Sequence, residues 1–516
     1  MRLSLWIRKS LGLALAVMGL TTPIKAGVDA PSPGCRFHCA GPGPIQADTN
    51  LVAINKIFGL PSTKAFGRLA AAGISGLLAQ DFGLGTNEAP LIAPLLADFL
   101  GNESAGYCDG SAGKPLGFVV ALKLDASEAA VWRTNLTQAF GGPGAGFTDE
   151  GFKGWRWSKT ASEPVWLVPA GEWLLAGRGE VLAPFRTQYL QAIKHQGRPI
   201  PLAKDNWLEA DLDCERLAAW MPDWVHLLRP ARIEATVKLE KSVFREEAHV
   251  FYPTPVAWAS RVWHVPTNLI GGPLTSFTAG QDISAYVNLS PAFSDICGSL
   301  LTNQFCAWAS GAMPLQNYIA WPVTDATEAL KAIGAKAPAE FNADLKRING
   351  GELQWQPDGN RLVLVNLGMF GPAIEATQDA GTPFLLANMF PISPGMEPIP
   401  QELLKEIIGR TNLVYYDWEF TGPRLQDWRM LGAALMSYRQ MNSPRMVAAE
   451  KMEARWLGAL RPLMGNSVTL VTRASPTELS IIRNSPIGLS SIEIYMLSNW
   501  LREIGSWSLS PRPLSH

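Results

Sequence analysis

Apolar residues recur along this chain with two spacings, and each spacing predicts one type of element. Helical spacing, with apolar residues returning every three or four positions, marks residues 63–80, 89–100, 181–194 and 489–504. In the last stretch Ile492, Met496 and Trp500 share one face, which predicts a C-terminal helix packed on the preceding sheet. Alternating apolar and polar positions predict strands at residues 207–213, 233–239, 245–252, 468–472 and 479–483. A further strand is expected at Leu51 to Asn55.

Several residue patterns occur twice along the chain, in the same order. Asp125 to Ala129 reads Asp-Ala-Ser-Glu-Ala after an apolar run, and Asp325 to Ala329 reads Asp-Ala-Thr-Glu-Ala after another. An Asp followed by Glu at the third helical position is the signature of a capping box, so both segments predict a helix start. Other residues recur in the same order: Pro169, Gly171, Leu174 and Pro184 with Pro357, Gly359, Leu362 and Pro372; Asn206 and Asp211 with Asn412 and Asp417; and residues 228–230 with 460–462.

This recurrence predicts two tandem copies of one module, at residues 47–256 and 272–487, followed by a C-terminal helix and tail at 488–516. Runs of two to four strands broken by single helices predict an α+β fold with largely antiparallel sheets and helices on one face. The hairpin signal is clearest at Asp358-Gly359, between two β-rich runs. Strict strand–helix alternation is missing, so a doubly wound parallel sheet is not favoured.

The composition narrows the class of protein. Of 516 residues, 47% are hydrophobic and 17% charged, which indicates a globular chain with ample core. Lys and Arg number 44 against 45 Asp and Glu, with no basic stripe of the kind that neutralises phosphates. Nucleic acid is therefore not an expected partner.

The N-terminus has the layout of an export signal. Arg2, Arg8 and Lys9 precede an apolar stretch from Leu11 to Leu20, which is too short to span a bilayer. We expect residues 1–26 to be removed, leaving a Pro- and Gly-rich linker at 27–46 and no transmembrane helix in the mature chain. The predicted location is the periplasm or cell envelope; the alternative is a retained segment that anchors the chain at a membrane surface.

Six cysteines in an exported chain can form disulfides. Two pairs are close in sequence, Cys35 with Cys39 and Cys297 with Cys306, although six cysteines allow 15 connectivities. Unpaired buried thiols are the alternative. A zinc site at residues 35–39, where a histidine stands between the cysteines, is disfavoured because a closed site needs four ligands.

Three carboxylates at alternate positions, Glu209, Asp211 and Asp213, share one face of a predicted strand. Such a ladder is a weak candidate for a metal site, since hard cations bind clustered oxygens, or for the acid pair of a glycoside hydrolase. The simpler interpretation is the solvated face of a half-buried strand. No cofactor is predicted, and the catalytic residues of any enzyme are left unassigned.

The other chemical signals are weak. The Gly-rich stretch at 141–146 lacks the Lys-Ser/Thr of a phosphate-binding loop, and the histidines form no known catalytic motif. The 19 tryptophans indicate heavy packing in the core, or exposed platforms for a sugar or peptide. These features favour a non-catalytic binding or scaffold protein, with an unknown protein or glycan as partner and an unknown oligomeric state. The alternative is an exported, carboxylate-based hydrolase that could act on glycans.

The chain also resembles a known type of protein. The segment Ala47 to Thr49, the strand–helix unit around Asp125, and the closing segments 485–489 and 499–501 are similar to uncharacterised exported bacterial proteins built from duplicated α+β modules. The resemblance implies the same architecture and export. It implies no activity and transfers no catalytic residue.

Overall fold

The computed structural model describes residues 33–110, 116–159, 163–200, 206–219, 229–258, 262–282, 303–311, 315–347, 351–356, 359–366, 371–390, 397–437 and 444–508. The side chains of residues 86, 347, 434–437, 444–446 and 506–508 are outside this description. The predicted export signal, Cys297 and Pro357 also lie outside the described residues.

One antiparallel sheet of 20 strands runs through the described part of the chain. Its first ten strands, from the outer edge to the centre, are β4 (Ala145–Asp149), β5 (Phe152–Trp157), β6 (Val165–Ala170), β7 (Trp173–Arg178), β3 (Gly117–Lys123), β2 (Ser104–Asp109), β1 (Cys35–Cys39), β8 (Asn206–Asp213), β9 (Arg232–Glu240) and β10 (Val243–Phe251).

The other ten strands, again from the outer edge to the centre, are β15 (Glu352–Trp355), β16 (Arg361–Val365), β17 (Ala373–Asp379), β18 (Thr382–Asn388), β14 (Asn317–Pro322), β13 (Gln304–Ser310), β12 (Leu274–Gln281), β20 (Leu413–Phe420), β21 (Asn466–Ser475) and β22 (Glu478–Ser485). Pairing of β10 with β22 joins the two sets. The two sets have the same arrangement when each is read from its outer edge. If the ten strands of a set are counted along the chain, the fourth to seventh lie outermost, the third, second and first follow in that order, and the last three lie nearest the centre. A separate pair is formed by β11 (Gly271–Gly272) and β19 (Glu397–Pro398).

Helices cover both faces of the sheet, whereas the sequence predicted one. On one face, which we call the α6 face, lie α6 (Ala126–Phe140) and α11 (Ala326–Arg347). On the other, the α7 face, lie α7 (Ala183–Gln196) and α12 (Gln401–Lys405). Directly opposed residues of paired strands point to the same face of a sheet. A continuous row of such residues runs from Leu122 under α6, through Glu246 and Arg483, to Leu362 under α11, so α6 and α11 lie on the same face.

The predicted helix caps are present in both halves. The Asp125 carboxylate accepts the amide of Glu128 at 2.9 Å, and the Glu128 carboxylate accepts the amide of Asp125 at 2.9 Å. In the second half the Asp325 carboxylate accepts the amide of Glu328 at 2.9 Å. These bonds satisfy amides that have no partner within the helix, which is why a four-residue pattern predicts the boundary so well.

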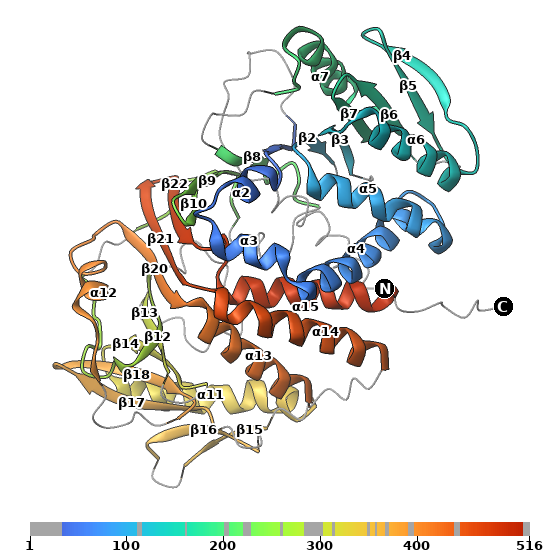
Figure 1. Ribbon diagram of the computed structural model, residues 1–516. Helices are drawn as coiled ribbons and strands as arrows, with labels where there is room; N and C mark the ends of the chain where they lie inside the picture. The colour runs from blue at the N-terminus through green and yellow to red at the C-terminus, as the bar shows by residue number, and fades with distance from the viewer. Residues whose placement is uncertain are drawn as a thin grey trace.

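A layer of long helices crosses the centre of the molecule (Figure 1). Residues of this layer pack on the α6 face around Phe244 and Ile494. Gly73 and Gly505 allow two of its helices to touch, because a Cβ at Gly73 would lie 2.5 Å from the Ile504 carbonyl oxygen. Besides α6, α7, α11 and α12, the described helices are α2 (Gly43–Ala47), α3 (Val52–Gly59), α4 (Pro61–Asp81), α5 (Ala89–Gly101), α13 (Thr421–Ser437), α14 (Pro444–Leu460) and α15 (Ser491–Ser508). Short 3-10 turns lie at Thr86–Glu88 and Arg461–Leu463.

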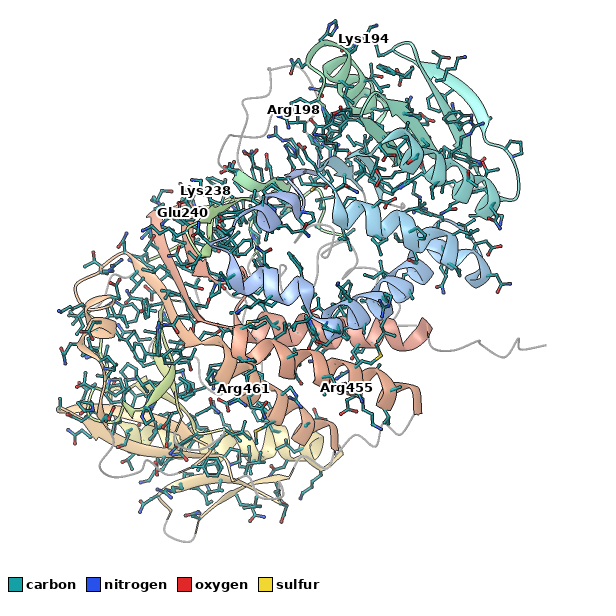
Figure 2. All side chains as sticks on the ribbon, viewed as in Figure 1. Lys194, Arg198, Lys238, Glu240, Arg455 and Arg461 are labelled. Atoms are coloured by element: carbon teal, nitrogen blue, oxygen red, sulfur yellow. The ribbon has the colours of Figure 1, made fainter. Side chains whose placement is uncertain are left out.

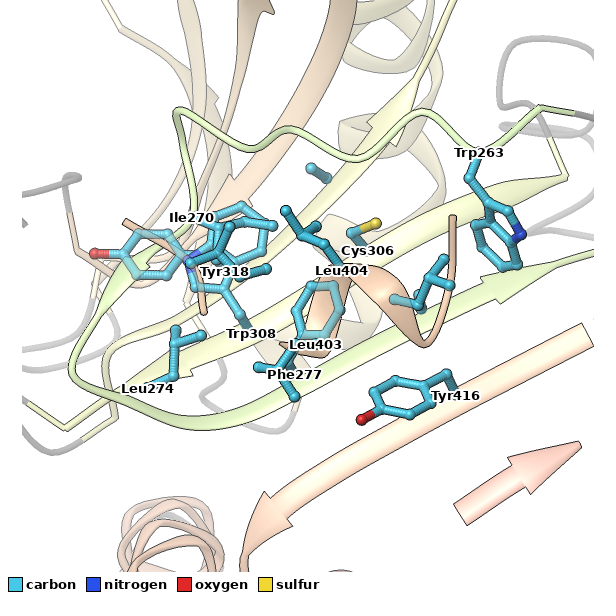
Figure 3. Close-up of a cluster of buried hydrophobic side chains, with 14 of the residues drawn as sticks. Trp263, Ile270, Leu274, Phe277, Cys306, Trp308, Tyr318, Leu403, Leu404 and Tyr416 are labelled. Atoms are coloured by element: carbon cyan, nitrogen blue, oxygen red, sulfur yellow. The ribbon is translucent and has the colours of Figure 1, made fainter. Parts of the chain in front are cut away.

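Tryptophans belong mainly to the core. Trp166 and Trp308 are among the largest fully buried side chains, while Trp355 is 37% exposed. In the second half Trp308 stacks on Tyr318, and Leu403 and Leu404 of α12 lie over this aromatic layer (Figure 3). The structure therefore favours packing over exposed platforms for most of the described tryptophans.

Two local predictions were wrong. Leu51 to Asn55 is not a strand, because residues 52–59 form helix α3 with Ile54 and Ile57 buried together. Short apolar runs are ambiguous between the two element types. The predicted linker at 27–46 contains β1, whose Cys35 and Phe37 pack in the core between β2 and β8. The Pro and Gly residues around β1 concealed its alternation.

Two of the residue matches were also wrong. Gly171 lies in the β6–β7 turn and Gly359 in the β15–β16 turn, so they occupy hairpins at different places in the strand order. Asp211 and Asp417 do lie on corresponding strands, β8 and β20, but on opposite faces. Asp417 lies in the same row of directly opposed residues as Arg483 of β22. The row that contains Asp211 reaches Ser480 of β22, and residues three positions apart on a strand point to opposite faces. A one-residue shift of register reverses the face of a side chain.

Candidate functional site

Charged side chains are concentrated on the α7 face of the central strands. We call this set the central charged face: Asp211, Arg232, Lys238, Arg245, Glu247, His249 and Glu478, on β8, β9, β10 and β22. Their side chains are 25% to 44% exposed. Figure 2 shows Lys238 near the end of β9, together with the neighbouring Glu240.

Ion pairs connect these side chains across the strands. Arg232 binds Asp211 with two bonds, from Nε at 2.7 Å and from Nη2 at 2.6 Å. The Arg232 Nη2 atom also lies 2.9 Å from Glu234, which is buried beneath it. Two-bond pairing of this kind fixes the orientation of the guanidinium.

The pairing continues onto β10 and β22. His249 Nδ1 lies 2.7 Å from Glu478, and Arg245 Nε donates to Glu247 at 2.8 Å. Lys238 Nζ is 3.6 Å from the same Glu247 carboxylate. The hydrogen bond from Arg245 is the main cause that lowers the pKa of Glu247, and Lys238 adds to it. Glu247 is thus held in its charged form beside two cations.

The three carboxylates of the predicted acidic ladder are each held by a different polar partner. Glu209 is buried, and its carboxylate accepts the Asn206 side-chain amide at 2.6 Å. Asp211 is held by Arg232, while Asp213 accepts the amide of Arg216 at 2.9 Å. Among the described residues, no group of three or more His, Cys, Asp or Glu side chains could hold a metal ion. Asp211 and Asp213 are half-buried and Glu209 is buried, so this strand face is only partly solvated and its charges are paired.

A second charged group is buried on the α6 face, where the halves meet. Arg483 of β22 lies 3.3 Å from Glu246 of β10 and 2.8 Å from Glu493 of α15. Burial raises the pKa of Glu246 to about 7, although Arg483 opposes the shift. Burial likewise raises the pKa of Asp417 to about 6, although the hydrogen bond from Thr278 opposes it. No local sequence pattern predicts this cluster, because Glu246, Asp417 and Arg483 lie on strands that come together only when the sheet forms.

A cavity of about 150 Å³ lies between α13, α14 and α15. Its wall includes Glu453 and Arg502, which form a buried pair at 2.6 Å, and Ser498 donates a hydrogen bond to Glu453 at 2.6 Å. Among the described residues, the buried Nε atom of Arg502 has no hydrogen-bond partner. Tyr495 also lines the cavity, close to Gly432.

The structure contradicts the predicted pair of Cys35 with Cys39, whereas the pair of Cys297 with Cys306 is untested because Cys297 lies outside the described residues. Cys35 and Cys39 lie at the two ends of β1, and four residues of an extended strand span about 13 Å, too far for a disulfide. Cys35 instead lies directly opposite Cys108 of β2. Cys306 is buried in the core of the second half, where burial raises its thiol pKa to about 12. His38 points to the opposite face from the two cysteines and lies 3.0 Å from Glu103.

No protein-family model, curated protein or solved structure matches this chain. Within the described residues, none of the helices has both the length and the apolar character needed to cross a membrane. The function must therefore be inferred from the geometry and charge of the surfaces described above.

Proposed function

We propose that this chain is an exported, non-catalytic binding protein of the cell envelope, built from two copies of one α+β module. The identical strand order read from each edge supports two copies, as do the matching positions of α6 with α11 and α7 with α12. Export is supported by the basic residues and short apolar stretch within residues 1–26.

The central charged face is the proposed binding surface, and its exposed, paired charges are the observation that carries the proposal. Exposed ion pairs contribute only about 0 to 1 kcal/mol each to stability. Exchanging their partners for charges on a ligand therefore costs the fold little. The face lies between α7 at one end and α12 at the other, so side chains from both halves border it.

We propose that the ligand is the glycopeptide polymer of the cell wall. Its peptide stems carry both free carboxylates and free amines, and its sugars carry hydroxyl groups. Arg232, Lys238 and Arg245 can bind the carboxylates, while Asp211, Glu247 and Glu478 can bind the amines and hydroxyls.

A carboxylate-based hydrolase is the second candidate, because Glu234 and Asp211 lie directly opposite each other on β9 and β8. Burial raises the pKa of Glu234, Arg232 lowers it and Asp211 raises it further. Directly opposed residues have Cβ atoms about 5 Å apart, and retaining glycoside hydrolases use two carboxyl groups at about 5 to 5.5 Å. Arg232 contacts both carboxylates, however, and its charge lowers the pKa of Glu234, which works against a protonated acid.

The test uses the purified full chain and isolated peptidoglycan sacculi. Protein that pellets with the sacculi gives an apparent Kd, and chromatography of the supernatant detects released fragments. We expect salt-sensitive binding without release of fragments. The double variant Lys238→Gln with Arg245→Gln should weaken binding about fivefold, equivalent to roughly 1 kcal/mol.

The matched control is Lys451→Gln with Arg455→Gln, which removes the same charge from the exposed side of α14 (Figure 2). It should bind like the unmodified chain. Release of soluble fragments that disappears in Glu234→Gln would establish the hydrolase instead. Absence of binding, or equal weakening by both double variants, would refute binding through the central charged face.

A further inference from the structure

Two thiols face each other in the middle of the first half of the sheet. Cys35 begins β1 and lies in register with Cys108 of β2. Directly opposed residues of antiparallel strands place their Cβ atoms about 4.5 to 5.5 Å apart on the same face. The neighbouring Cys35 thiol is also the largest cause of the raised pKa of Cys108. A disulfide requires Cβ atoms about 3.5 to 4.5 Å apart, so a small approach of the strands is sufficient.

We propose that Cys35 and Cys108 are a disulfide-forming pair that links β1 to β2. The oxidant is a disulfide, either a small molecule such as oxidised glutathione or an exchange protein. One cysteine thiolate attacks the oxidant's disulfide, forming a mixed disulfide and releasing one thiol. The second cysteine thiolate then attacks the sulfur of the first cysteine in this mixed disulfide, which forms the Cys35–Cys108 bond and releases the second thiol of the oxidant. Two electrons pass to the oxidant, and its two released thiolates take up the two protons.

The remaining thiols near β1 are less well placed. Cys214 follows the end of β8, and the residue opposite Cys35 on that strand is Leu212. Its thiol contacts the Leu212 carbonyl at 3.9 Å. Cys39 lies at the far end of β1, and its sulfur accepts the amide of Gly41 at 3.5 Å. Of these cysteines, Cys108 is the one that lies directly opposite Cys35 on a paired strand.

The position gives the bond a structural role. β1 lies between β2, which leads to the outer strands, and β8, which leads to the centre of the sheet. A bond from Cys35 to Cys108 would close a long loop that contains α2 to α5, and loops of this size restrict the unfolded chain strongly. The hydrogen bond with Cys35 and burial both raise the pKa of Cys108, so exchange should be slow once the fold has formed. Oxidation is therefore expected during folding.

The experiment refolds the full chain from guanidinium with and without a glutathione redox buffer, then blocks free thiols and measures the mass. We expect a loss of two hydrogens and a linked peptide containing Cys35 and Cys108. The thermal midpoint should rise by several degrees and fall again on reduction. Cys39→Ser and Cys214→Ser should keep this behaviour.

Cys35→Ser and Cys108→Ser should each lose both the linked peptide and the effect of reductant on the midpoint. The mass measurement does not depend on how stable a variant is, so a poorly folded variant still gives an answer. A linked peptide joining Cys35 to Cys39 or to Cys214, or four or more free thiols with no linkage at Cys35, would overturn the pairing. The assay contains no wall polymer, so its result is independent of what the central charged face binds.

Discussion

Glu246 of β10 and Arg483 of β22 lie directly opposite each other at the strand pair that joins the two halves of the sheet. The guanidinium of Arg483 is 3.3 Å from the Glu246 carboxylate and also binds Glu493 with two bonds, at 2.8 and 2.9 Å. One side chain thus connects the first half, the second half and α15. Because this group is largely buried, its charge state affects the stability of the whole sheet.

The first prediction concerns pH. The pKa of Glu246 is raised from 4.5 to about 7 and that of Asp417 from 3.8 to about 6. The folded chain therefore binds these protons more tightly than the unfolded chain does. Their contribution to stability is largest at low pH and is lost as the pH rises from about 5 to 7, by up to about 1.4 kcal/mol per pH unit for one proton.

Glu246→Gln and Asp417→Asn should each flatten the dependence of the unfolding free energy on pH in this range. Guanidinium titrations at pH 5, 6, 7 and 8 measure it. Glu240→Gln, an exposed substitution on β9, is the control and should leave the slope unchanged. An identical slope in all four proteins would show that neither buried carboxyl titrates as described.

The second prediction concerns the contact between α4 and α15. A Cβ at Gly73 would lie 2.5 Å from the Ile504 carbonyl oxygen, so Gly73→Ala must separate the two helices. We expect a loss of roughly 1 to 3 kcal/mol, the usual cost of overpacking. Gly76, three residues further along α4, has nothing within 4 Å of the equivalent position. Gly76→Ala should therefore be neutral or stabilising by up to about 1 kcal/mol. Thermal unfolding of the two variants would contradict the packing if Gly76→Ala were the more harmful.

The third prediction concerns the cap of α11. Replacing Asp325 with Ala removes the acceptor for the Glu328 amide and should cost about 1 kcal/mol. Asp325→Asn keeps an oxygen at that position and should retain most of the stability. Chemical denaturation measures both. Equal losses in the two variants would mean that the charge, and not the cap bond, stabilises the helix start.

Local patterns predicted local structure well in this chain. The capping box at Asp125, the helix cap at Asp325, the paired β-runs and the long helices depend on residues close in sequence, so a few positions define them. The order of strands, by contrast, depends on which apolar faces meet. Nothing in the residues of β1 reveals that it lies between β2 and β8.

The site was less predictable than the fold, for the same physical reason. The acidic alternation of Glu209 and Asp211 was visible, but the partner that neutralises Asp211 is Arg232, on another strand beyond an intervening segment. Matching Asp211 to Asp417 by spacing also failed, because a shift of one residue moves a side chain to the other face. The buried cluster around Arg483 and the contact of Cys35 with Cys108 arise only when distant strands pair.

Hydrogen–deuterium exchange with and without soluble peptidoglycan fragments tests the central claim most directly, because it reports which strands the ligand covers. Binding at the central charged face predicts slower exchange at residues 232–251 and 478–485, which form β9, β10 and β22. It predicts unchanged exchange at 426–433, 450–457 and 495–502, the segments around the helical cavity. Protection confined to the cavity segments, or no protection in either region under conditions where the fragments bind, would contradict the claim.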